Sequence, residues 1–140
     1  MSDQMSMGEE LLERYDVSLL EQRFLDLGIT LTKEQKIQFL QYYEYLVEKN
    51  QVMNLTAITE YEAVVEKHFA DSLAAAAVYD IGKAKSVIDV GTGAGFPGIP
   101  LKIVYPHLKI VLLDSLNKRV QFLNEVISLL HLKDAQAVHG

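Results

Sequence analysis

Cysteine and tryptophan are absent from this 140-residue sequence, which also has only three prolines. No stretch reaches the roughly 18 consecutive apolar residues that a membrane-spanning helix needs. Without cysteine there is no disulfide framework and no thiolate site for zinc or an iron–sulfur cluster, which excludes the small secreted disulfide proteins. The first ten residues have neither the basic start nor the apolar run of a secretory signal. These absences predict a cytoplasmic protein that does not insert into a membrane.

Basic residues are also scarce, since 13 Lys and Arg face 19 Asp and Glu and leave a net charge of −6. This balance argues against a general nucleic-acid coat, because non-specific affinity for phosphates comes almost entirely from Lys and Arg. It is compatible with a specific and locally basic RNA site. With 49% apolar residues, the chain is long enough to bury a hydrophobic core of its own.

The first eighty residues predict helices. Residues 18–21 and 32–35 have the capping-box pattern, in which a Ser or Thr and a Glu or Gln satisfy backbone N–H groups at a helix start. Gly28 supplies a left-handed stop for the first helix, and Gly82 breaks a third helix that starts near residue 59. The sequence therefore predicts a helical subdomain over residues 1–82, with helices over about 19–27, 32–50 and 59–81.

After Gly82 the pattern changes to short apolar runs that alternate with helical stretches. The sequence predicts strands over 86–90, 109–114 and 135–139, and helices over 99–105 and 118–130. This order predicts an α/β, Rossmann-like parallel sheet with right-handed crossovers over residues 83–140. Parallel sheets usually have five or more strands and two covered faces. We therefore expect a sheet truncated after its third strand, whose free edge favours self-association.

Residues 87–100 contain the most informative motif of the chain. A predicted strand runs into a glycine-rich turn, and a helix follows, so backbone N–H groups and the positive end of the helix face one spot. This arrangement indicates a nucleotide-like ligand. The helix opens with Gly98, Ile99 and Pro100, so the Lys and Ser or Thr of a phosphate-binding P-loop are missing.

Two interpretations of the glycines remain open. Gly93, Gly95 and Gly98 spell G-x-G-x-x-G, and Asp114 follows 21 residues after Gly93, as in dinucleotide-binding folds of NAD-dependent oxidoreductases. Counted from Asp89, the same segment spells D-x-G-x-G-x-G. A carboxylate there would repel a pyrophosphate but suits an ammonium or sulfonium ligand, which indicates S-adenosylmethionine. In both cases Asp114 would accept hydrogen bonds from ribose hydroxyls.

Simpler structural roles also remain open for three of these residues. In this simpler view, Asp89 accepts hydrogen bonds from N–H groups of the turn and has no contact with a ligand. Asp114 would be the N-cap of the next helix, and Phe96 would pack in the core beneath the turn.

Four segments together resemble one known family. They are residues 54–59, 67–73, 89–101 and 112–120, and the chain is similar over residues 18–140 to the bacterial ribosomal RNA small-subunit methyltransferase G family, also called glucose-inhibited division protein B. The resemblance implies a class I S-adenosylmethionine-dependent fold and methylation of guanine N7 in 16S ribosomal RNA. It implies cofactor contacts from Gly91, Phe96 and Asp114, with Asp89, Gly93 and Gly95 completing the predicted site. The family continues for about a hundred further residues, so an inactive fragment or a non-catalytic interaction module is an alternative.

The implied chemistry explains why we predict no catalytic side chain. Guanine N7 has a free lone pair, so its attack on a sulfonium methyl needs no general base, and alignment of the reactants provides the rate enhancement. Phe96 could offer the guanine an apolar or stacking surface. No metal site is predicted.

The remaining polar motifs have simple explanations. Lys67 with Asp71 and His68 with Ser72 are i,i+4 neighbours on one helix, which predicts a surface ion pair and a local hydrogen bond. Residues 54–56 are predicted to form a turn between the helical subdomain and the sheet. A basic rim for RNA or the small ribosomal subunit could come from Lys67, Lys102, Lys109, Lys118 and Arg119, although solvated helix faces explain them equally well.

Overall fold

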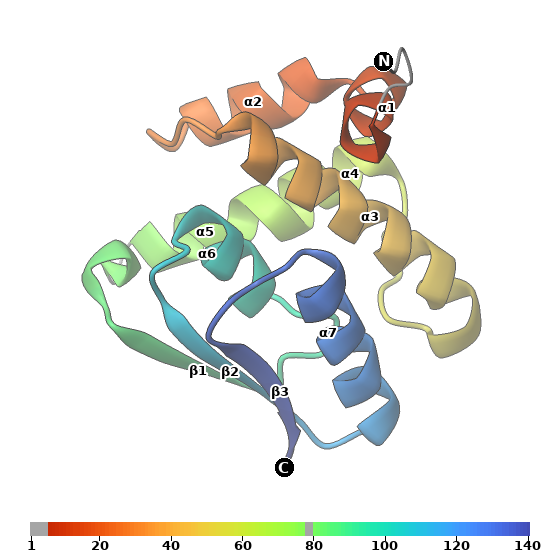
Figure 1. Ribbon diagram of the computed structural model, residues 1–140, viewed down its shortest axis with the longest axis vertical. Coiled ribbons are helices and arrows are strands. Elements are labelled where there is room, and N and C mark those ends of the chain that lie inside the picture. Colours follow the sequence, from red (N-terminus) through yellow and green to blue (C-terminus); the bar gives the residue numbers. More distant parts are fainter. Residues whose placement is uncertain (1–5, 78–79) are drawn as a thin grey trace.

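A computed structural model, drawn in Figure 1, describes residues 6–77 and 80–140. The helical part consists of α1 (Met7–Arg14), α2 (Val17–Leu25), α3 (Lys33–Met53), α4 (Tyr61–Val64), the π-helical turn η1 (Val65–Ala70), α5 (Asp71–Ala77) and the 3₁₀ turn η2 (Ile81–Lys83). The sheet part consists of β1 (Ser86–Val90), α6 (Gly98–Val104), β2 (Lys109–Asp114), α7 (Asn117–Leu129) and β3 (Ala135–His139). Within the described ranges, no helix has the length and apolar character to cross a membrane.

One of the two predicted capping boxes is confirmed. At the start of α3, the Thr32 hydroxyl accepts from the Gln35 N–H at 3.1 Å, and the Gln35 side chain accepts from the Thr32 N–H at 2.8 Å. The box at residues 18–21 is wrong, because Asp16 caps α2 by accepting from the Leu19 N–H. Asp16 offers a charged acceptor two residues earlier than Ser18, so the helix begins earlier. Gly28 has the predicted positive φ of 78°.

The helical part contains three further differences from the prediction. α1 was not predicted; it packs on α3 through the buried Leu11. The third predicted helix is present but changes to π-helical geometry over Val65–Ala70, and its predicted end includes residues 78–79, which lie outside the described ranges. Asn54, in the left-handed conformation, ends α3, so residues 54–56 lead into α4 and not into the sheet.

All three predicted strands are confirmed, and both predicted crossover helices are shifted by one residue. The sheet is parallel, with the order β1-β2-β3 and Val87 beside Ile110 and Leu112 beside Ala137. α6 packs on β1 and β2, and α7 packs on β2 and β3. Because both crossovers advance in the same direction, both helices lie on the same face of the sheet (Figure 1).

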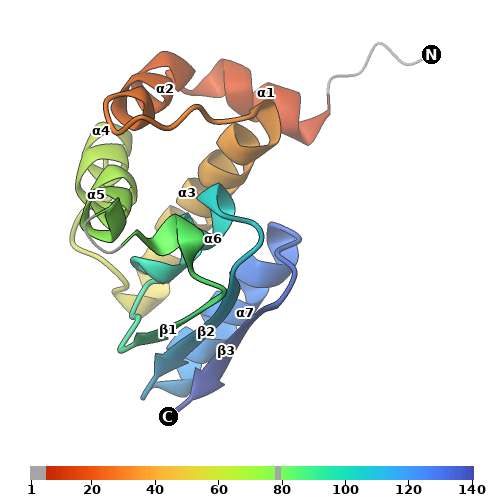
Figure 2. The ribbon, with the colours of Figure 1, turned by 90° about the vertical axis from the view of Figure 1, so that its left-hand side faces the viewer.

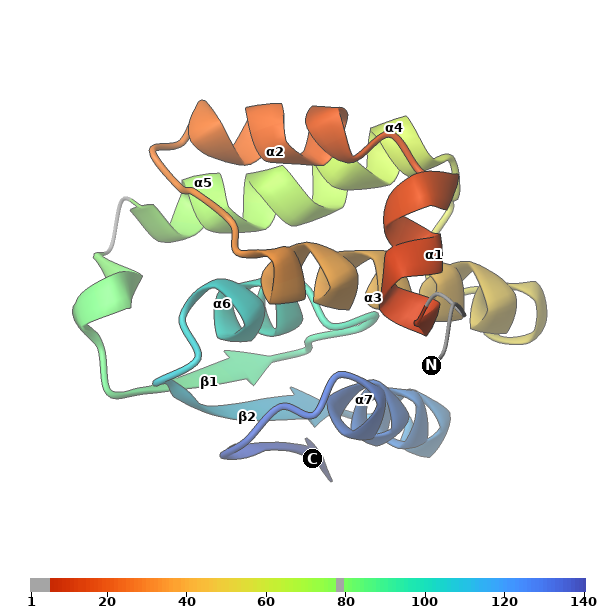
Figure 3. The same ribbon diagram turned by 45° about the horizontal axis from the view of Figure 1, so that its top comes forward.

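The remaining helices extend this arrangement on the covered face only. α3 packs on both α6 and α7, and α5 also packs on α6, while α2 contacts α3 and the π-helical turn η1 farther from the sheet, as Figures 2 and 3 show. One hydrophobic core contains buried residues of both parts, including Phe39 and Phe69 with Ile99 and Leu123. The other face of the sheet is open: Ile88 is 64% exposed, and Val90 is 75% exposed.

Candidate functional site

The glycine loop, residues 91–97, lies at the carboxyl end of the sheet. The N–H groups of Gly91 and Thr92 both donate to the Leu113 carbonyl, at 2.9 and 3.0 Å, which ties the loop to the end of β2. The loop then folds on itself, because the N–H groups of Gly95 and Phe96 donate to the Thr92 carbonyl. Open parallel sheets bind ligands at this edge, where the loops after neighbouring strands meet.

Asp89 is half-buried at the end of β1. Its Oδ2 accepts hydrogen bonds from the Thr92 hydroxyl at 2.7 Å and from the Gly98 N–H at 3.0 Å. Burial raises the pKa of the Asp89 carboxyl, and these two hydrogen bonds oppose the rise. Asp89 therefore has the predicted structural role in the turn. Within the described residues Oδ1 has no hydrogen-bond donor, so it is available to a cationic ligand.

Asp114 ends β2 and is only 2% exposed. Its Oδ2 accepts from the Gly93 N–H at 2.9 Å, and its Oδ1 accepts from the Leu116 N–H at 3.0 Å with the Arg119 guanidinium 3.6 Å away. The N-cap role is wrong, because the N-cap of α7 is Leu116, two residues later, and the helix begins at Asn117. Each carboxylate oxygen keeps a second lone pair, which can accept a hydrogen bond from a ribose hydroxyl.

The glycines of the motif serve two different purposes. A Cβ atom at Gly91 or Gly93 would have no other atom within 4 Å, although both residues have positive φ, at 69° and 60°. A Cβ at Gly95 would lie 2.6 Å from the Tyr42 hydroxyl, and one at Gly98 would lie 2.3 Å from the Leu112 side chain. The first two glycines therefore face open space, whereas the last two are required by internal packing.

This division favours one interpretation of the motif over the other. In a dinucleotide fingerprint the second glycine lets the pyrophosphate approach the backbone. That glycine would be Gly95, which is buried against Tyr42 and Ile99. The open glycines are instead Gly91 and Gly93, the first two of the D-x-G-x-G-x-G pattern.

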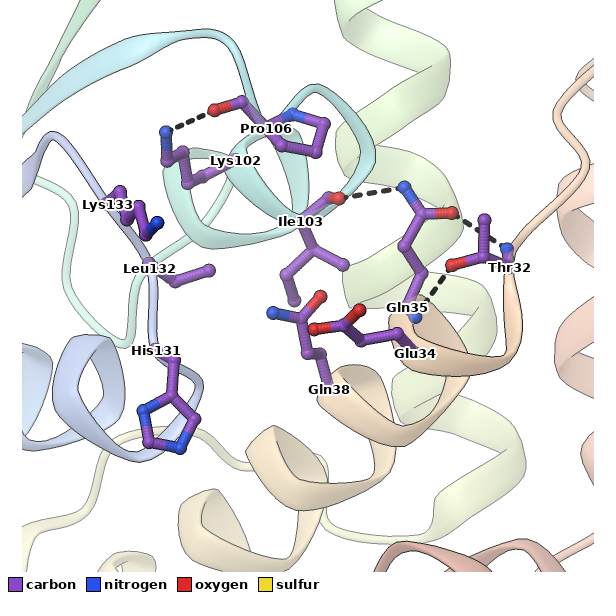
Figure 4. A pocket seen from close by; sticks show the side chains of 10 residues that line it. All are labelled: Thr32, Glu34, Gln35, Gln38, Lys102, Ile103, Pro106, His131, Leu132 and Lys133. Carbon is purple, nitrogen blue, oxygen red and sulfur yellow. Dashed lines mark hydrogen bonds between the residues drawn. The ribbon is translucent and has the colours of Figure 1, made fainter.

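A separate hollow of about 300 Å³ lies at the other end of the sheet, near the amino ends of the strands (Figure 4). It is bordered by the start of α3, the end of α6 and the loop before β3. The Lys102 ammonium on its wall donates to the Pro106 and Leu108 carbonyls, both at 2.6 Å. This hollow lies at the carboxyl end of α6, whereas the glycine loop leads into the amino end of α6, so the hollow is not part of the candidate site.

Comparison with known proteins identifies the family. The family model for rRNA small subunit methyltransferase G matches residues 35–140. The chain belongs to the rRNA small subunit methyltransferase G family. It is similar to proteins named ribosomal RNA small subunit methyltransferase G from Lachnoclostridium phytofermentans (56% identity over 125 residues, 89% of this chain and 52% of the relative), Macrococcus caseolyticus (53% over 118 residues, 84% and 50%) and Bacillus cereus (54% over 122 residues, 87% and 49%).

Membership of the methyltransferase G family confirms the predicted Rossmann-like class I fold, to which the three-stranded parallel sheet corresponds. The matched region includes Asp89, Asp114 and the whole glycine loop. The chain spans about half the length of the curated relatives that it matches.

Beside the loop of this methyltransferase G family member, the local hydrogen bond predicted between His68 and Ser72 is confirmed, whereas the ion pair predicted between Lys67 and Asp71 is wrong. The Ser72 hydroxyl donates to the His68 main-chain carbonyl, while the His68 ring stacks on Phe96 with 4.4 Å between the ring centroids. In the described structure, no ion pair joins Lys67 and Asp71. Phe96 is half-buried and also contacts Tyr42, so it packs against the core as well as forming part of the loop.

The predicted basic rim does not form a single surface. Lys118 and Arg119 lie at the start of α7, close to the candidate site, whereas Lys109 begins β2 at the opposite end of the sheet. Lys102 is only 2% exposed, because its ammonium closes the turn between α6 and β2. The position of Lys109 follows from the predicted direction of its strand, but the burial of Lys102 could not be predicted, because it depends on how the turn between α6 and β2 closes.

Proposed function

We propose that this chain provides the cofactor-binding part of an S-adenosylmethionine-dependent methyltransferase that acts on guanine N7 of small-subunit ribosomal RNA. The observation that carries the proposal is the open position beside Gly91 and Gly93, bordered by Asp89 and Asp114 at the carboxyl edge of the sheet. The names of the relatives support the ribosomal RNA substrate.

The residues at this edge fit the cofactor. Asp89 has a free oxygen for the ammonium group of the amino-acid moiety, and Asp114 has lone pairs for ribose hydroxyls. The two open glycines let a ligand approach the backbone, as a close contact requires. When bound, S-adenosylmethionine supplies an electrophilic methyl group on its sulfonium.

The chain's own residues then contribute orientation and not proton transfer. Guanine N7 has a lone pair and needs no base, so holding the nucleophile in line with the methyl group is the main requirement. Lys118 and Arg119 lie near this edge and can attract RNA phosphates. A cytoplasmic location also stays a prediction.

Calorimetric titration with S-adenosylhomocysteine, with NADH in parallel, tests the proposal. We expect S-adenosylhomocysteine to bind and NADH not to bind. Asp114→Asn should weaken the interaction by about ten- to a hundredfold, because a hydrogen bond to a charged group contributes about 1.5–3 kcal/mol. Asp134→Asn, at an exposed position before β3, is the matched control. Preferential binding of NADH would support the oxidoreductase alternative instead.

Methyl transfer to undermethylated small ribosomal subunits tests the activity of the chain itself. Transfer would exclude the alternative of a non-catalytic fragment or interaction module. Binding of S-adenosylhomocysteine without transfer would limit this chain to cofactor binding.

A further inference from the structure

We propose that His68 is a positioning residue, which holds Phe96 and thereby keeps the glycine loop in its cofactor-binding shape, and that Thr56 fixes the orientation of the His68 ring. The inference rests on the proposed function, because it concerns the same loop. It brings together two segments, residues 54–56 and 67–72, to which the proposed function gives no role.

The contact between His68 and Phe96 is the first observation. The two rings are nearly parallel, with an angle of 13° between their planes and 4.4 Å between their centroids. Phe96 also contacts Tyr42 and Phe69, but at 5.6 and 6.1 Å and with larger angles. The Phe96 N–H donates to the Thr92 carbonyl, next to Gly93. A displacement of Phe96 is therefore transmitted directly to the open part of the loop.

The hydrogen bond between His68 and Thr56 is the second observation. His68 Nε2 lies 2.8 Å from the Thr56 hydroxyl, which already accepts from the Ile58 N–H at 3.0 Å. The hydroxyl hydrogen is thus free for donation to Nε2 in the neutral ring with its proton on Nδ1. Burial lowers the pKa of His68, which favours this neutral form. Thr56 is itself held by Asn50, whose side chain accepts from the Thr56 N–H at 2.7 Å.

The π-helical turn is the third observation. It covers Val65–Ala70, and His68 lies within it between the buried Val65 and Phe69. π-helical turns are rare, and they occur frequently at functional sites. Here Val65 and Phe69 remain in the core while the His68 ring meets Phe96. The Ser72 hydroxyl, which donates to the His68 carbonyl, restrains the same turn.

Four substitutions separate positioning from simple packing. His68→Ala removes the ring, and His68→Phe keeps a flat ring but no hydrogen bond. Thr56→Val removes the hydroxyl with little change of shape, and Thr56→Ser keeps it. His107→Ala, at an exposed position away from the loop, is the control.

The first measurement is the affinity for S-adenosylhomocysteine by calorimetry. An aromatic pair contributes roughly 0.5–1.5 kcal/mol beyond its burial, so we expect His68→Ala to weaken binding by about three- to tenfold. His68→Phe should restore most of this loss. Thr56→Val should weaken binding more than Thr56→Ser does, and His107→Ala should have no effect.

The second measurement needs no ligand: it is the hydrogen exchange of the Gly95 and Phe96 amides, which are bonded to the Thr92 carbonyl. We expect exchange to accelerate several-fold in His68→Ala and to remain near that of the unaltered chain in His68→Phe. If the unaltered chain binds no S-adenosylhomocysteine but His68→Ala accelerates exchange, the proposed function fails for this chain and the positioning role stands.

Three results would overturn the inference. The first is unchanged affinity and exchange in His68→Ala while the unaltered chain binds S-adenosylhomocysteine. The second is a loss in His68→Phe as large as that in His68→Ala, because the ring would then not be the cause. The third result applies if His68→Ala does not fold. It is that Thr56→Val and Thr56→Ser have the same affinity for S-adenosylhomocysteine and the same amide exchange rates.

Discussion

Asp89 combines a structural and an electrostatic role within one carboxylate. Because Oδ2 is held by Thr92 and Gly98, the charge at Oδ1 is fixed at the loop. We expect Asp89→Asn to keep the fold, since an amide oxygen can accept the same hydrogen bonds, but to weaken S-adenosylhomocysteine binding by about tenfold. Calorimetry measures this change, with Asp134→Asn as control. Weaker NADH binding together with unchanged S-adenosylhomocysteine binding would refute our choice of ligand.

The raised pKa of Asp89 predicts a pH dependence of the free energy of unfolding, which the same substitution tests. Burial raises the folded-state pKa of Asp89 above its ordinary value of 3.8, so the folded state holds this proton more tightly than the unfolded state does. The contribution of Asp89 to stability is therefore present below pH 3.8 and is lost as the pH rises through the folded-state pKa. Urea unfolding of Asp89→Asn should show the variant gaining stability relative to the parent chain over that rise. A difference that stays constant with pH would contradict a raised pKa.

Sequence located the site residues better than their partners. The placement of Asp89 and Asp114 at one edge could be predicted, because Asp89 is the second-last residue of its strand and Asp114 the last of its own, and the ends of parallel strands meet at one edge. The contacts of His68 could not be predicted in the same way. Its neighbours Thr56 and Phe96 are 12 and 28 positions away, and only tertiary packing brings them together.

At the scale of the elements, the close approach of α6 to the sheet depends on Gly98. A Cβ there would lie 2.3 Å from Leu112 and 2.9 Å from the Asp89 carboxylate, so Gly98→Ala should reduce the free energy of unfolding by about 3 kcal/mol. A Cβ at Gly93 has no other atom within 4 Å, so Gly93→Ala should reduce the free energy of unfolding only by the cost of positive φ, about 1 kcal/mol. Urea unfolding measures both. We expect Gly93→Ala to affect S-adenosylhomocysteine affinity more than stability. Equal losses of stability in Gly98→Ala and Gly93→Ala would contradict the different roles of the two glycines.

Gln35 joins the helical part to the sheet part. Its side-chain oxygen completes the capping box of α3, and its Nε2 donates to the Ile103 and Val104 carbonyls at the end of α6. Gln35→Glu keeps the acceptor, loses the donor and puts a negative charge at a helix C-terminus, so we expect a loss of about 1–3 kcal/mol in urea unfolding. Gln121→Glu, on the exposed side of α7, is the control. Similar effects of the two substitutions would show that the Gln35 contact adds no stability.

Elements were predictable where one local pattern dominated. The strands over 86–90 and 109–114 were, because each is a short run rich in Val, Ile or Leu that ends near an Asp, whereas residues 135–139 were predicted mainly from their place after a helix in the alternating order. The eight-residue α1 was not, because a helix that short is stabilised mainly by its packing on α3. The π-helical turn has no local signal either: Val65 and Phe69 fit an ordinary apolar stripe, and the extra residue appears only in the structure.

At the scale of the whole molecule, the helices lie on one side only. α6, α7 and α3 cover one face of the sheet, while the opposite face presents Ile88 and Val90 to solvent. In the described structure, β1 pairs only with β2, so its other edge has backbone groups available for pairing. Unpaired edges next to apolar surface favour association between chains. The free edge was predicted from the number of strands in the sequence, and together with the open face it is the basis of the final prediction.

We expect the chain to self-associate through β1 and the open face at micromolar concentrations, and Val90→Lys to reduce this association, because charge on an edge strand opposes pairing. Val52→Lys is a closely matched control, since Val52 lies on α3 and is 80% exposed, against 75% for Val90. Sedimentation velocity over a concentration series distinguishes the outcomes. If both lysine variants reduce association equally, the added net charge is the cause and not the edge of β1. A parent chain that stays monomeric would show that the open face of the sheet is tolerated in water.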